Sequence, residues 1–209
     1  MKREYYDFLL NAVKNGSGDS DRHLLTLYSI ALQISAKSVL ELGVRDGKTT
    51  LPFLCAMAEN NGHLYSVDIQ NTNFVCPSDL YNHWTFYTRD AIEWLTSSKN
   101  QEMFYDFKLP NKFDLVYIDD WHSYDHVRAE LEIIESMITP SSLIILHDLM
   151  YSNAQPDYRS NVNTDDPEWK NGGPYRAVAE LDRNTWEWST IPVNHGLTIL
   201  RKKTGNILT

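Results

Sequence analysis

Two aspartates stand behind apolar, strand-forming runs in the second half of the chain. Asp119 directly follows the run 114–118, and Asp148 follows the run 143–146 with one histidine between them. The carboxyl ends of neighbouring parallel strands lie about 4.8 Å apart, so we expect these two carboxylates to converge on one point. Paired carboxylates suit a hard divalent cation such as Mg²⁺, which takes one or two protein carboxylates and keeps several waters. The spacing therefore predicts a metal site formed by Asp119 and Asp148.

A histidine accompanies each aspartate and adds a group that can move protons. His122 lies three residues after Asp119, and His147 immediately precedes Asp148. An imidazole with a pKa of about 6.5 can accept a proton near neutral pH. His126 would share a helical face with His122 if the helix began early, and this pair is an alternative zinc site without an obvious third ligand. The remaining histidines are predicted to be surface or turn residues: His23, His63, His83 and His195.

A glycine-containing loop opens the first strand–helix unit and offers a place for a small ligand. The segment 38–42 predicts a short buried strand, and Glu41, Gly43 and Gly47 follow the pattern E-x-G-x-x-x-G. The two glycines let the backbone turn sharply and approach a ligand closely. The next helix presents unpaired N–H groups in its first turn. We therefore expect a ligand-binding site where this strand passes into the helix.

Two nucleotide-binding loops compete for the same segment. A dinucleotide-binding loop, G-x-G-x-x-G, requires glycine where this chain has Arg45. A phosphate-binding loop, G-x-x-x-x-G-K-[ST], shares the ending Gly47-Lys48-Thr49 but needs one more spacer residue than this chain has. Asp46 would also place negative charge beside the phosphates. A P-loop-like protein that binds or hydrolyses nucleotides is kept as the alternative.

The loop instead resembles the first motif of class I S-adenosylmethionine-dependent methyltransferases. Two further carboxylates follow in the order of that family, Asp68 after the run 63–67 and Asp90 after the run 84–87. A carboxylate at the end of the second strand can bind both ribose hydroxyls. The resemblance implies that Asp90 contacts the adenine amino group, although Asp can also cap a helix there. It implies S-adenosyl-L-methionine as the cofactor and these cofactor-binding residues: Glu41, Gly43, Gly47, Thr49, Asp68, Ile69, Asp90, Ala91 and Asp119.

The segments I-D-x-x-H-S-Y and L-I-I-L-H-D resemble, more specifically, a branch that methylates hydroxyl groups of sugars and natural products. They occupy residues 118–124 and 143–148. This branch is methyltransferase family 24, with cephalosporin-hydroxylase-like and macrolide-sugar O-methyltransferases, and the resemblance covers about residues 39–200. It implies an enzyme that moves a methyl group from S-adenosylmethionine to a hydroxyl of a small molecule, a sugar or glycosylated natural product, with the help of a metal.

The same resemblance implies roles for residues at the ends of the fourth and fifth strands. Asp119 and Asp148 are expected to hold the metal, and His122 to act with Asp119 in catalysis. Catechol-type relatives carry Asp-Asn after the fifth strand, whereas leucine follows Asp148 here, so the third ligand stays open between His147 and Asp120. His147 suits Mg²⁺ poorly, because this ion prefers oxygen. Four residues are expected to face the acceptor: His122, Tyr124, His147 and Tyr175.

Helical and strand patterns alternate along the chain with short links, which predicts an α/β fold. We expect a Rossmann-like, doubly wound, mostly parallel sheet of about seven strands with helices on both faces. Gly196 indicates a hairpin between the last two strands and therefore an antiparallel C-terminal edge. The chain 1–209 is expected to form a single domain that begins with two helices in 1–36. The predicted strands are 38–42, 63–67, 84–87, 114–118, 143–146, 185–191 and 197–201, and the predicted helices are 5–15, 20–35, 48–60, 92–97, 124–137 and 175–181.

Two long segments, 69–82 and 149–173, lack a helical or strand pattern. Both follow the carboxyl ends of strands, where open α/β sheets bind their ligands. The second contains Tyr151, Tyr158 and Trp169, whose rings could stack on a substrate. We expect the segment 149–173 to be a substrate lid.

The composition limits the classes of partner. With 42% hydrophobic residues, the 209-residue chain can bury one sizeable core. A net charge of −9 disfavours nucleic acid, whose phosphates need a basic face. No apolar run approaches the ~20 residues of a membrane span, the N-terminus lacks a signal-peptide core, and Cys55 and Cys76 show no metal spacing. We expect a cytoplasmic protein with a small-molecule acceptor, and a homo-oligomer through the two leading helices is left open.

Overall fold

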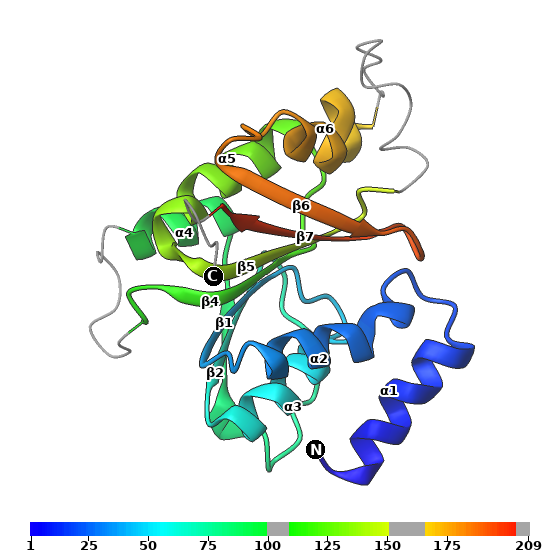
Figure 1. Ribbon diagram of the computed structural model, residues 1–209. Coiled ribbons are helices and arrows are strands. Elements are labelled where there is room, and N and C mark those ends of the chain that lie inside the picture. Colours follow the sequence, from blue (N-terminus) through cyan, green and yellow to red (C-terminus); the bar gives the residue numbers. More distant parts are fainter. Residues whose placement is uncertain (100–108, 151–165, 204–209) are drawn as a thin grey trace, which may run out of the picture.

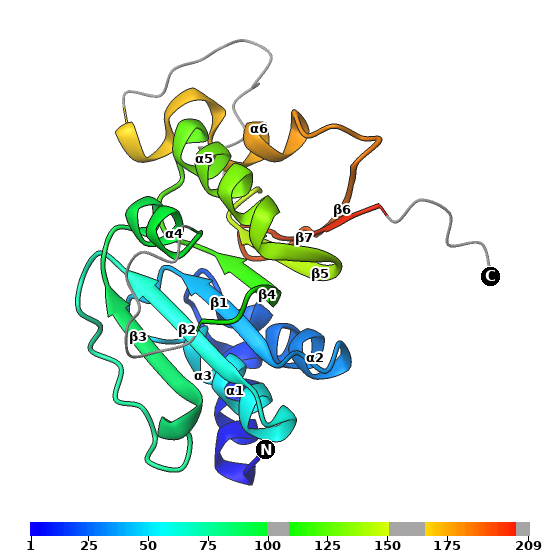
Figure 2. The same ribbon diagram turned by 90° about the vertical axis from the view of Figure 1, so that its left-hand side faces the viewer.

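A mixed sheet of seven strands forms the centre of the protein, seen in a computed structural model that describes residues 1–99, 109–150 and 166–203 (Figure 1). The strands are β1 (Ser38–Leu42), β2 (His63–Asp68), β3 (Trp84–Thr88), β4 (Phe113–Ile118), β5 (Ile138–His147), β6 (Trp186–Ile191) and β7 (Leu197–Lys202). Their spatial order is β3-β2-β1-β4-β5-β7-β6, so β3 and β6 lie at opposite edges (Figure 2). β7 runs antiparallel to both β5 and β6, and the other pairs are parallel. The predicted mostly parallel sheet with an antiparallel C-terminal edge is confirmed.

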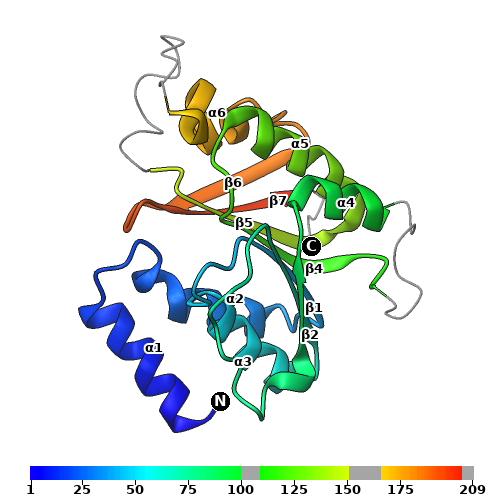
Figure 3. The ribbon, with the colours of Figure 1, turned by 180° about the vertical axis from the view of Figure 1, so that it is seen from behind.

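Helices cover both faces of the sheet, as predicted (Figures 1 and 3). One face carries α1 (Arg3–Asn15), α2 (Leu24–Gln33) and α3 (Thr50–Asn60), and the other carries α4 (Ala91–Lys99), α5 (Tyr124–Ile134) and α6 (Gly173–Ala179). Short 3₁₀ turns complete the described elements: η1 (Asp21–His23), η2 (Tyr81–His83), η3 (Glu135–Met137) and η5 (Pro167–Gly172). Among the described residues, no helix is both long and apolar enough to cross a membrane.

The boundaries of three predicted elements differ most from the structure. The helix expected over 20–35 is a 3₁₀ turn followed by α2, and the helix expected over 124–137 ends in η3. β5 begins at Ile138, five residues earlier than predicted, where the β-branched Ile138 and Thr139 favour a strand. Ile138 pairs with Phe113 before the register between β4 and β5 becomes irregular. Local preference and strand pairing therefore extend β5 over residues 138–142, for which no element was predicted.

Alternating side chains of the central strands divide the core into two layers. Leu40, Val116 and Ile144 belong to the cluster beneath α4, α5 and α6. Their neighbours Val39, Leu115 and Ile145 belong to the cluster beneath α1, α2 and α3, and all six residues are buried. Successive residues of a strand point to opposite faces, so an almost continuous apolar run is what a sheet covered on both sides requires. The core thus fixes the ends of the strands, where the polar residues lie.

The carboxyl ends of β1, β2 and β4 approach one another closely. The amide of Gly43 donates to the carbonyl of Val67 at 2.9 Å, and the amide of Asp119 donates to the carbonyl of Leu42 at 2.9 Å. Gly43 has φ +87°, and a Cβ atom there would lie 2.2 Å from the Asp119 carbonyl oxygen. Only glycine adopts this conformation and leaves room for the neighbouring backbone. Gly43 is therefore needed for the strand ends to meet.

The Gly43→Ala substitution should destabilise the protein by about 2–4 kcal/mol, because it combines a left-handed backbone with a clash against rigid backbone atoms. Denaturant unfolding would measure the loss. Gly18→Ala is a suitable comparison, because the nearest atom to its new Cβ, at 2.6 Å, is the mobile Lys48 ammonium. A loss at Gly43 no larger than the loss at Gly18 would contradict this account of the strand ends.

Candidate active site

A cavity of about 740 Å³ opens at the carboxyl ends of β1, β2 and β4. Six of the predicted cofactor-binding residues line it: Gly43, Asp68, Ile69, Asp90, Ala91 and Asp119. Ligand sites of open α/β sheets lie at this edge because the strands diverge there toward helices on opposite faces. The topology therefore brings together residues that are far apart in the sequence.

Asp68 holds the glycine loop against the end of β2. Its Oδ2 accepts hydrogen bonds from the amides of Val44 and Arg45 at 2.8 and 2.9 Å, and its Oδ1 accepts one from the amide of Gln70 at 2.8 Å. The carboxylate also lines the cavity. Asp68 thus fixes the shape of the loop and presents negative charge to a ligand.

Three predicted cofactor-binding residues do not line this cavity: Glu41, Gly47 and Thr49. Glu41 is fully buried and accepts hydrogen bonds from the hydroxyls of Thr49, Thr50 and Ser66 at 2.8, 2.9 and 2.6 Å. Gly47 has φ +75°, and the ring of Phe74 packs where its Cβ would be. The contacts of Glu41 connect β1, β2 and the start of α3. Glu41, Gly47 and Thr49 therefore support the glycine loop and do not form the wall of the cavity.

Burial raises the pKa of Glu41 to about 7, and the hydrogen bonds from Ser66, Thr49 and Thr50 oppose that shift. Desolvation disfavours the charged form of a carboxyl group, whereas donors to its oxygens favour it. The hydroxyl groups therefore only partly compensate for the removal of Glu41 from water. Glu41 therefore changes its charge state near neutral pH.

Asp90 combines the two roles considered for it. Its Oδ1 accepts a hydrogen bond from the amide of Glu93 at 2.9 Å, which caps the start of α4. Asp90 and Ala91 also line the cavity. The cap fixes the carboxylate beside the space that a ligand would occupy.

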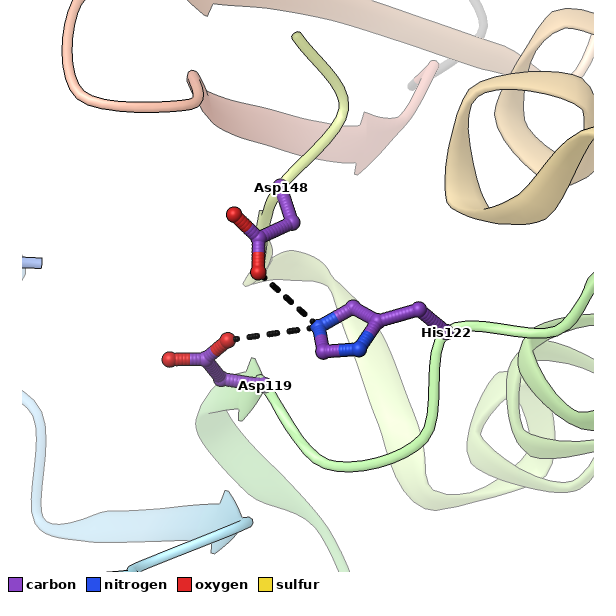
Figure 4. Close-up of side chains that lie close together, drawn as sticks. All are labelled: Asp119, His122 and Asp148. Atoms are coloured by element: carbon purple, nitrogen blue, oxygen red, sulfur yellow. Dashed lines mark ion pairs between the residues drawn. The ribbon is translucent and has the colours of Figure 1, made fainter. Parts of the chain in front are cut away.

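Asp119, His122 and Asp148 meet beside the cavity (Figure 4). The Nε2 atom of His122 lies 3.0 Å from Asp148 Oδ2 and 3.6 Å from Asp119 Oδ1. His122 and Asp148 are buried, and one ligand atom from each of the three residues lies within 4.8 Å of the others. The predicted convergence of the two carboxylates is present, and His122 stands between them.

Opposite charges dominate the electrostatics of this group. Burial lowers the pKa of His122, but Asp119 and Asp148 outweigh that effect and raise it to about 10. Burial likewise favours neutral carboxyl groups, yet the histidines hold the pKa values of Asp119 and Asp148 below their usual range. Burial also lowers the pKa of the neighbouring His147, and Asp119 and Asp148 again outweigh that effect and raise it to about 11. Two imidazolium rings, those of His122 and His147, thus balance the two carboxylates.

His147 and His195 approach the same carboxylates from the other side. His147 Nδ1 lies 3.3 Å from Asp119 Oδ1 and 3.1 Å from Asp148 Oδ1, and its Nε2 donates to the carbonyl of Asn194 at 3.0 Å. His195 Nδ1 lies 3.0 Å from Asp148 Oδ1. The prediction of a plain turn residue at His195 therefore missed its pairing with a site carboxylate. His195 and Asp148 are 47 residues apart in the sequence, so no pattern near His195 indicates this contact.

His23 corrects the prediction of a surface or turn histidine. It is 1% exposed, and its Nε2 donates to the carbonyl of Val193 at 2.9 Å. Its ring centroid lies 5.5 Å from that of His147. His23 therefore anchors the turn between β6 and β7 beneath the site.

Asp120, His126 and Glu130 form a second, separate group. His126 Nε2 lies 3.1 Å from Asp120 Oδ2 and 3.5 Å from Glu130 Oε1, and Glu130 is fully buried. The alternative zinc pair of His122 and His126 is therefore wrong, because each ring faces different carboxylates. Asp120 likewise pairs with His126 and does not join Asp119 and Asp148 as a third ligand. The cap of α5 is the Ser123 hydroxyl, which leaves the Asp120 side chain for His126.

Tyr124 does not face the site, contrary to the prediction. Its hydroxyl donates to Glu180 Oε2 at 2.7 Å, and the Arg176 guanidinium lies 4.4 Å from its ring centroid. These contacts join α5 to α6, because the helix beginning at Ser123 turns this side chain toward its neighbour. Tyr175 lies in the first turn of α6 and outside the cavity lining. Its contact with the acceptor stays a prediction.

Sequence reasoning missed several residues that belong to the site. Trp121 lines the cavity and is 43% exposed, between two residues that the sequence had singled out. Within the predicted lid, residues 151–165, including Tyr151 and Tyr158, lie outside the described residues. The described end of that segment reaches the site, where Glu168 and Trp169 contact His122. The sequence feature that could have identified Trp121 as a site residue is a tryptophan within a polar turn.

Comparison with known protein families gives one match. Residues 40–149 fit the model of a family described as a methyltransferase domain. This range runs from the middle of β1 past the end of β5 and contains both Asp–His segments. A search of the curated proteins gives no match.

Several solved structures share the whole architecture. The O-methyltransferase TomG of Streptomyces achromogenes, involved in tomaymycin synthesis and solved with S-adenosylmethionine, is 16% identical, with a TM-score of 0.69 over 98% of this chain and 92% of that chain. An O-methyltransferase from Bacillus cereus, solved with S-adenosylhomocysteine, is 15% identical, with a TM-score of 0.67 over 97% and 92%. The methyltransferase MycE of the mycinamycin pathway, solved with Mg and S-adenosylhomocysteine, is 18% identical, with a TM-score of 0.60 over 88% of this chain and 49% of that chain. At such identities the likeness concerns the fold.

Replacing Glu41 by glutamine should flatten the pH dependence of stability. Between its ordinary pKa of 4.5 and its folded value of about 7, Glu41 binds more protons in the folded than in the unfolded protein. The free energy of unfolding therefore falls as pH rises through this window, by up to about 3 kcal/mol. Denaturant unfolding from pH 4.5 to 7.5 should show a smaller decline for Glu41→Gln than for the wild type. The exposed Glu4→Gln variant is the control, and an unchanged slope in Glu41→Gln would refute the assignment.

Proposed function

The chain belongs to the methyltransferase domain family, and from that premise we propose that it transfers a methyl group from S-adenosylmethionine to a hydroxyl group of a small molecule. The position of Asp119 carries this proposal. Its carboxylate lines the cavity beside the glycine loop and also belongs to the group with His122 and Asp148. A cofactor in the cavity and an alcohol beside that group would meet at Asp119.

The cavity fits S-adenosylmethionine in size and charge. Its volume of about 740 Å³ lies within the range of small-molecule sites. Five aspartates contribute to its wall against two arginines: Asp46, Asp68, Asp90, Asp119 and Asp120, with Arg45 and Arg89. The excess of negative charge favours a ligand that carries a sulfonium and an amino group. Asp68 lines this cavity at the end of β2, which supports the proposal that its carboxylate binds the ribose hydroxyls. Trp121 offers an aromatic surface for the base.

The bound cofactor would supply an electrophilic methyl group on its positively charged sulfur. The protein must then hold the acceptor oxygen in line with that methyl group, which contributes up to ~7–11 kcal/mol in favourable cases. His122 is placed to receive the hydroxyl proton at Nε2, the atom that faces Asp119 and Asp148. It can accept a proton only in its neutral form. The two carboxylates must therefore be neutralised by another positive charge.

A divalent cation fits this requirement. Asp119 and Asp148 offer carboxylate oxygens, and the buried His122 Nε2 and His147 Nδ1 atoms make no hydrogen bond of normal geometry with any described residue. We propose that Asp119 and Asp148 hold the ion through their carboxylate oxygens, which leaves the Nε2 lone pair of His122 to accept the hydroxyl proton. Such an ion would lower the pKa of an alcohol beside it. Carboxylate oxygens suit Mg²⁺ or Mn²⁺, whereas imidazole nitrogens suit zinc, iron or nickel, so an ion held by the two aspartates is expected to be Mg²⁺ or Mn²⁺.

A sugar or another natural product is the acceptor class that the neighbours favour. TomG is involved in tomaymycin synthesis, and MycE belongs to the mycinamycin pathway. The MycE structure contains Mg, in keeping with a metal-assisted reaction. The acidic, partly aromatic surroundings of the site suit a polar, uncharged acceptor.

The P-loop alternative has no support in the loop geometry. The Lys48 ammonium, which would bind phosphates, lies 3.3 Å from Asp21 Oδ1 and outside the cavity lining. Asp46 lines the cavity instead, where its charge would repel a phosphate. The family match also overturns this alternative.

Calorimetric titration should detect binding of S-adenosylhomocysteine and no comparable binding of ATP. The Asp68→Asn variant should bind the cofactor product about 10-fold to 100-fold more weakly, because hydrogen bonds to a charged group contribute about 1.5–3 kcal/mol. Asp7→Asn on the exposed surface of α1 serves as the matched control. Tight binding of ATP together with no detectable heat on titration with S-adenosylhomocysteine would contradict the proposal.

Removal of divalent ions should lower methyl transfer by about 100-fold or more, because loss of several kcal/mol of stabilisation lowers a rate by that factor. The measurement is turnover with a hydroxyl-bearing acceptor after treatment with a chelator, followed by addition of Mg²⁺ or Mn²⁺. The added ion should restore the wild type but not Asp148→Asn, while the exposed Glu132→Gln variant should behave as the wild type. Full turnover in the chelated enzyme would exclude Asp119 and Asp148 as ligands of an essential metal.

A further inference from the structure

The segment Pro167–Gly172, which precedes α6, contacts His122 through two consecutive side chains. The Nδ1 atom of His122 donates a hydrogen bond to Glu168 Oε1 at 2.9 Å. The ring of Trp169 stacks on the His122 ring with centroids 4.3 Å apart and planes 9° apart. One contact fixes an edge of the imidazole and the other covers a face, so together they determine its orientation.

The segment that supplies these contacts is itself anchored. The Asp166 carboxylate accepts a hydrogen bond from the amide of Glu168 at 3.0 Å, and the Asp166 carbonyl accepts one from the amide of Trp169 at 3.1 Å. Trp169 is 8% exposed. A buried indole on a capped turn has few alternative positions, so the carboxylate beside it is held close to His122.

The contact with Glu168 determines which ring nitrogen carries the proton. A neutral imidazole has one N–H and one lone pair, and its hydrogen bonds select between the two tautomers. At Nε2, Asp148 Oδ2 and Asp119 Oδ1 lie 3.0 and 3.6 Å away, and these carboxylates alone would favour a proton on Nε2. Only a competing acceptor at Nδ1 can keep the proton on the far side of the ring. Glu168 is that acceptor.

We propose that Glu168 is a positioning residue that holds the neutral His122 ring with its proton on Nδ1 and its Nε2 lone pair toward Asp119 and Asp148, while Trp169 fixes the plane of the ring. This inference rests on the proposed methyl transfer, in which Nε2 receives the hydroxyl proton. The same orientation would serve an Nε2 atom that binds a cation, because carboxylates behind ligating histidines act in this way. Glu168 does not touch the reacting atoms in either case.

Steady-state kinetics test the proposal. Glu168→Ala should lower kcat by about 10-fold to 100-fold, the usual cost of losing a carboxylate behind a functional histidine, and leave KM for S-adenosylmethionine nearly unchanged. Glu168→Gln keeps an acceptor oxygen for Nδ1–H and should retain most of the activity. Lys170→Ala, an exposed residue of the same segment, should match the wild type. A wild-type kcat in Glu168→Ala, or equal losses in the alanine and glutamine variants, would overturn the proposal.

Nitrogen NMR of the histidine rings separates this inference from the proposed function. With ¹⁵N-labelled histidine, long-range proton–nitrogen spectra identify the tautomer of His122 under conditions in which its ring is neutral, and the His122→Asn variant assigns its signals. The proton should reside on Nδ1 in the wild type and shift to Nε2 in Glu168→Ala. An unchanged tautomer refutes the role of Glu168 even if methyl transfer is found. The expected shift without any methyl transfer would refute the proposed function and leave the orienting contact in place.

Discussion

Negative charge at the ends of β4 and β5 is the constraint on which the arrangement of the site depends. The two strands pair with Ile118 opposite Leu146, so the carboxylates that follow must share a small, partly dry space. Like charges in such a place repel, and burial adds to the cost of each. His122 from the β4–α5 turn and His147 from β5 compensate that charge at 3.0–3.6 Å. The histidines are therefore needed to keep the acidic residues ionised before any ligand is bound.

The surrounding backbone holds the ends of the strands, and with them these charged side chains, in fixed positions. Gly43 allows the backbone of β1 to touch the backbone that carries Asp119. Glu41, buried behind the loop, gathers three hydroxyl groups from β2 and the start of α3. A buried polar cluster of this kind is stabilising only when each of its polar groups makes a hydrogen bond. Glu41 of the predicted cofactor motif thus supports the loop one layer below the cavity, whereas Gly43 of the same motif lines the cavity. Asp68 connects the two, because it binds the loop amides and also lines the cavity.

The sequence predicted the layers of the fold and the main acidic residues of the site because both depend on short-range patterns. Apolar runs with turn signals located all the strands, and residues directly behind those runs had to lie at the same sheet edge. The contacts of Glu168, His195 and Tyr124 could not be predicted in this way, because they depend on how distant segments pack in the folded chain. They follow from the path of the segment before α6, from the pairing of β5 with β7, and from the helical phase set by the Ser123 cap. The predicted start of β5 was wrong for a related reason, because pairing with β4 extends the strand into residues 138–142, for which the sequence predicted no element.

The same geometry explains why His122 needs a partner on each side. Glu168 lies at its Nδ1 and the two aspartates lie at its Nε2, so three carboxylates surround one ring. Such surroundings favour the imidazolium, which is a good counter-ion and a poor proton acceptor. Positive charge brought to Asp119 and Asp148 reverses the balance at Nε2 while Glu168 continues to attract the proton at Nδ1. In the proposed methyl transfer, His122 would therefore become able to accept a proton only after a cationic ligand has bound at Asp119 and Asp148.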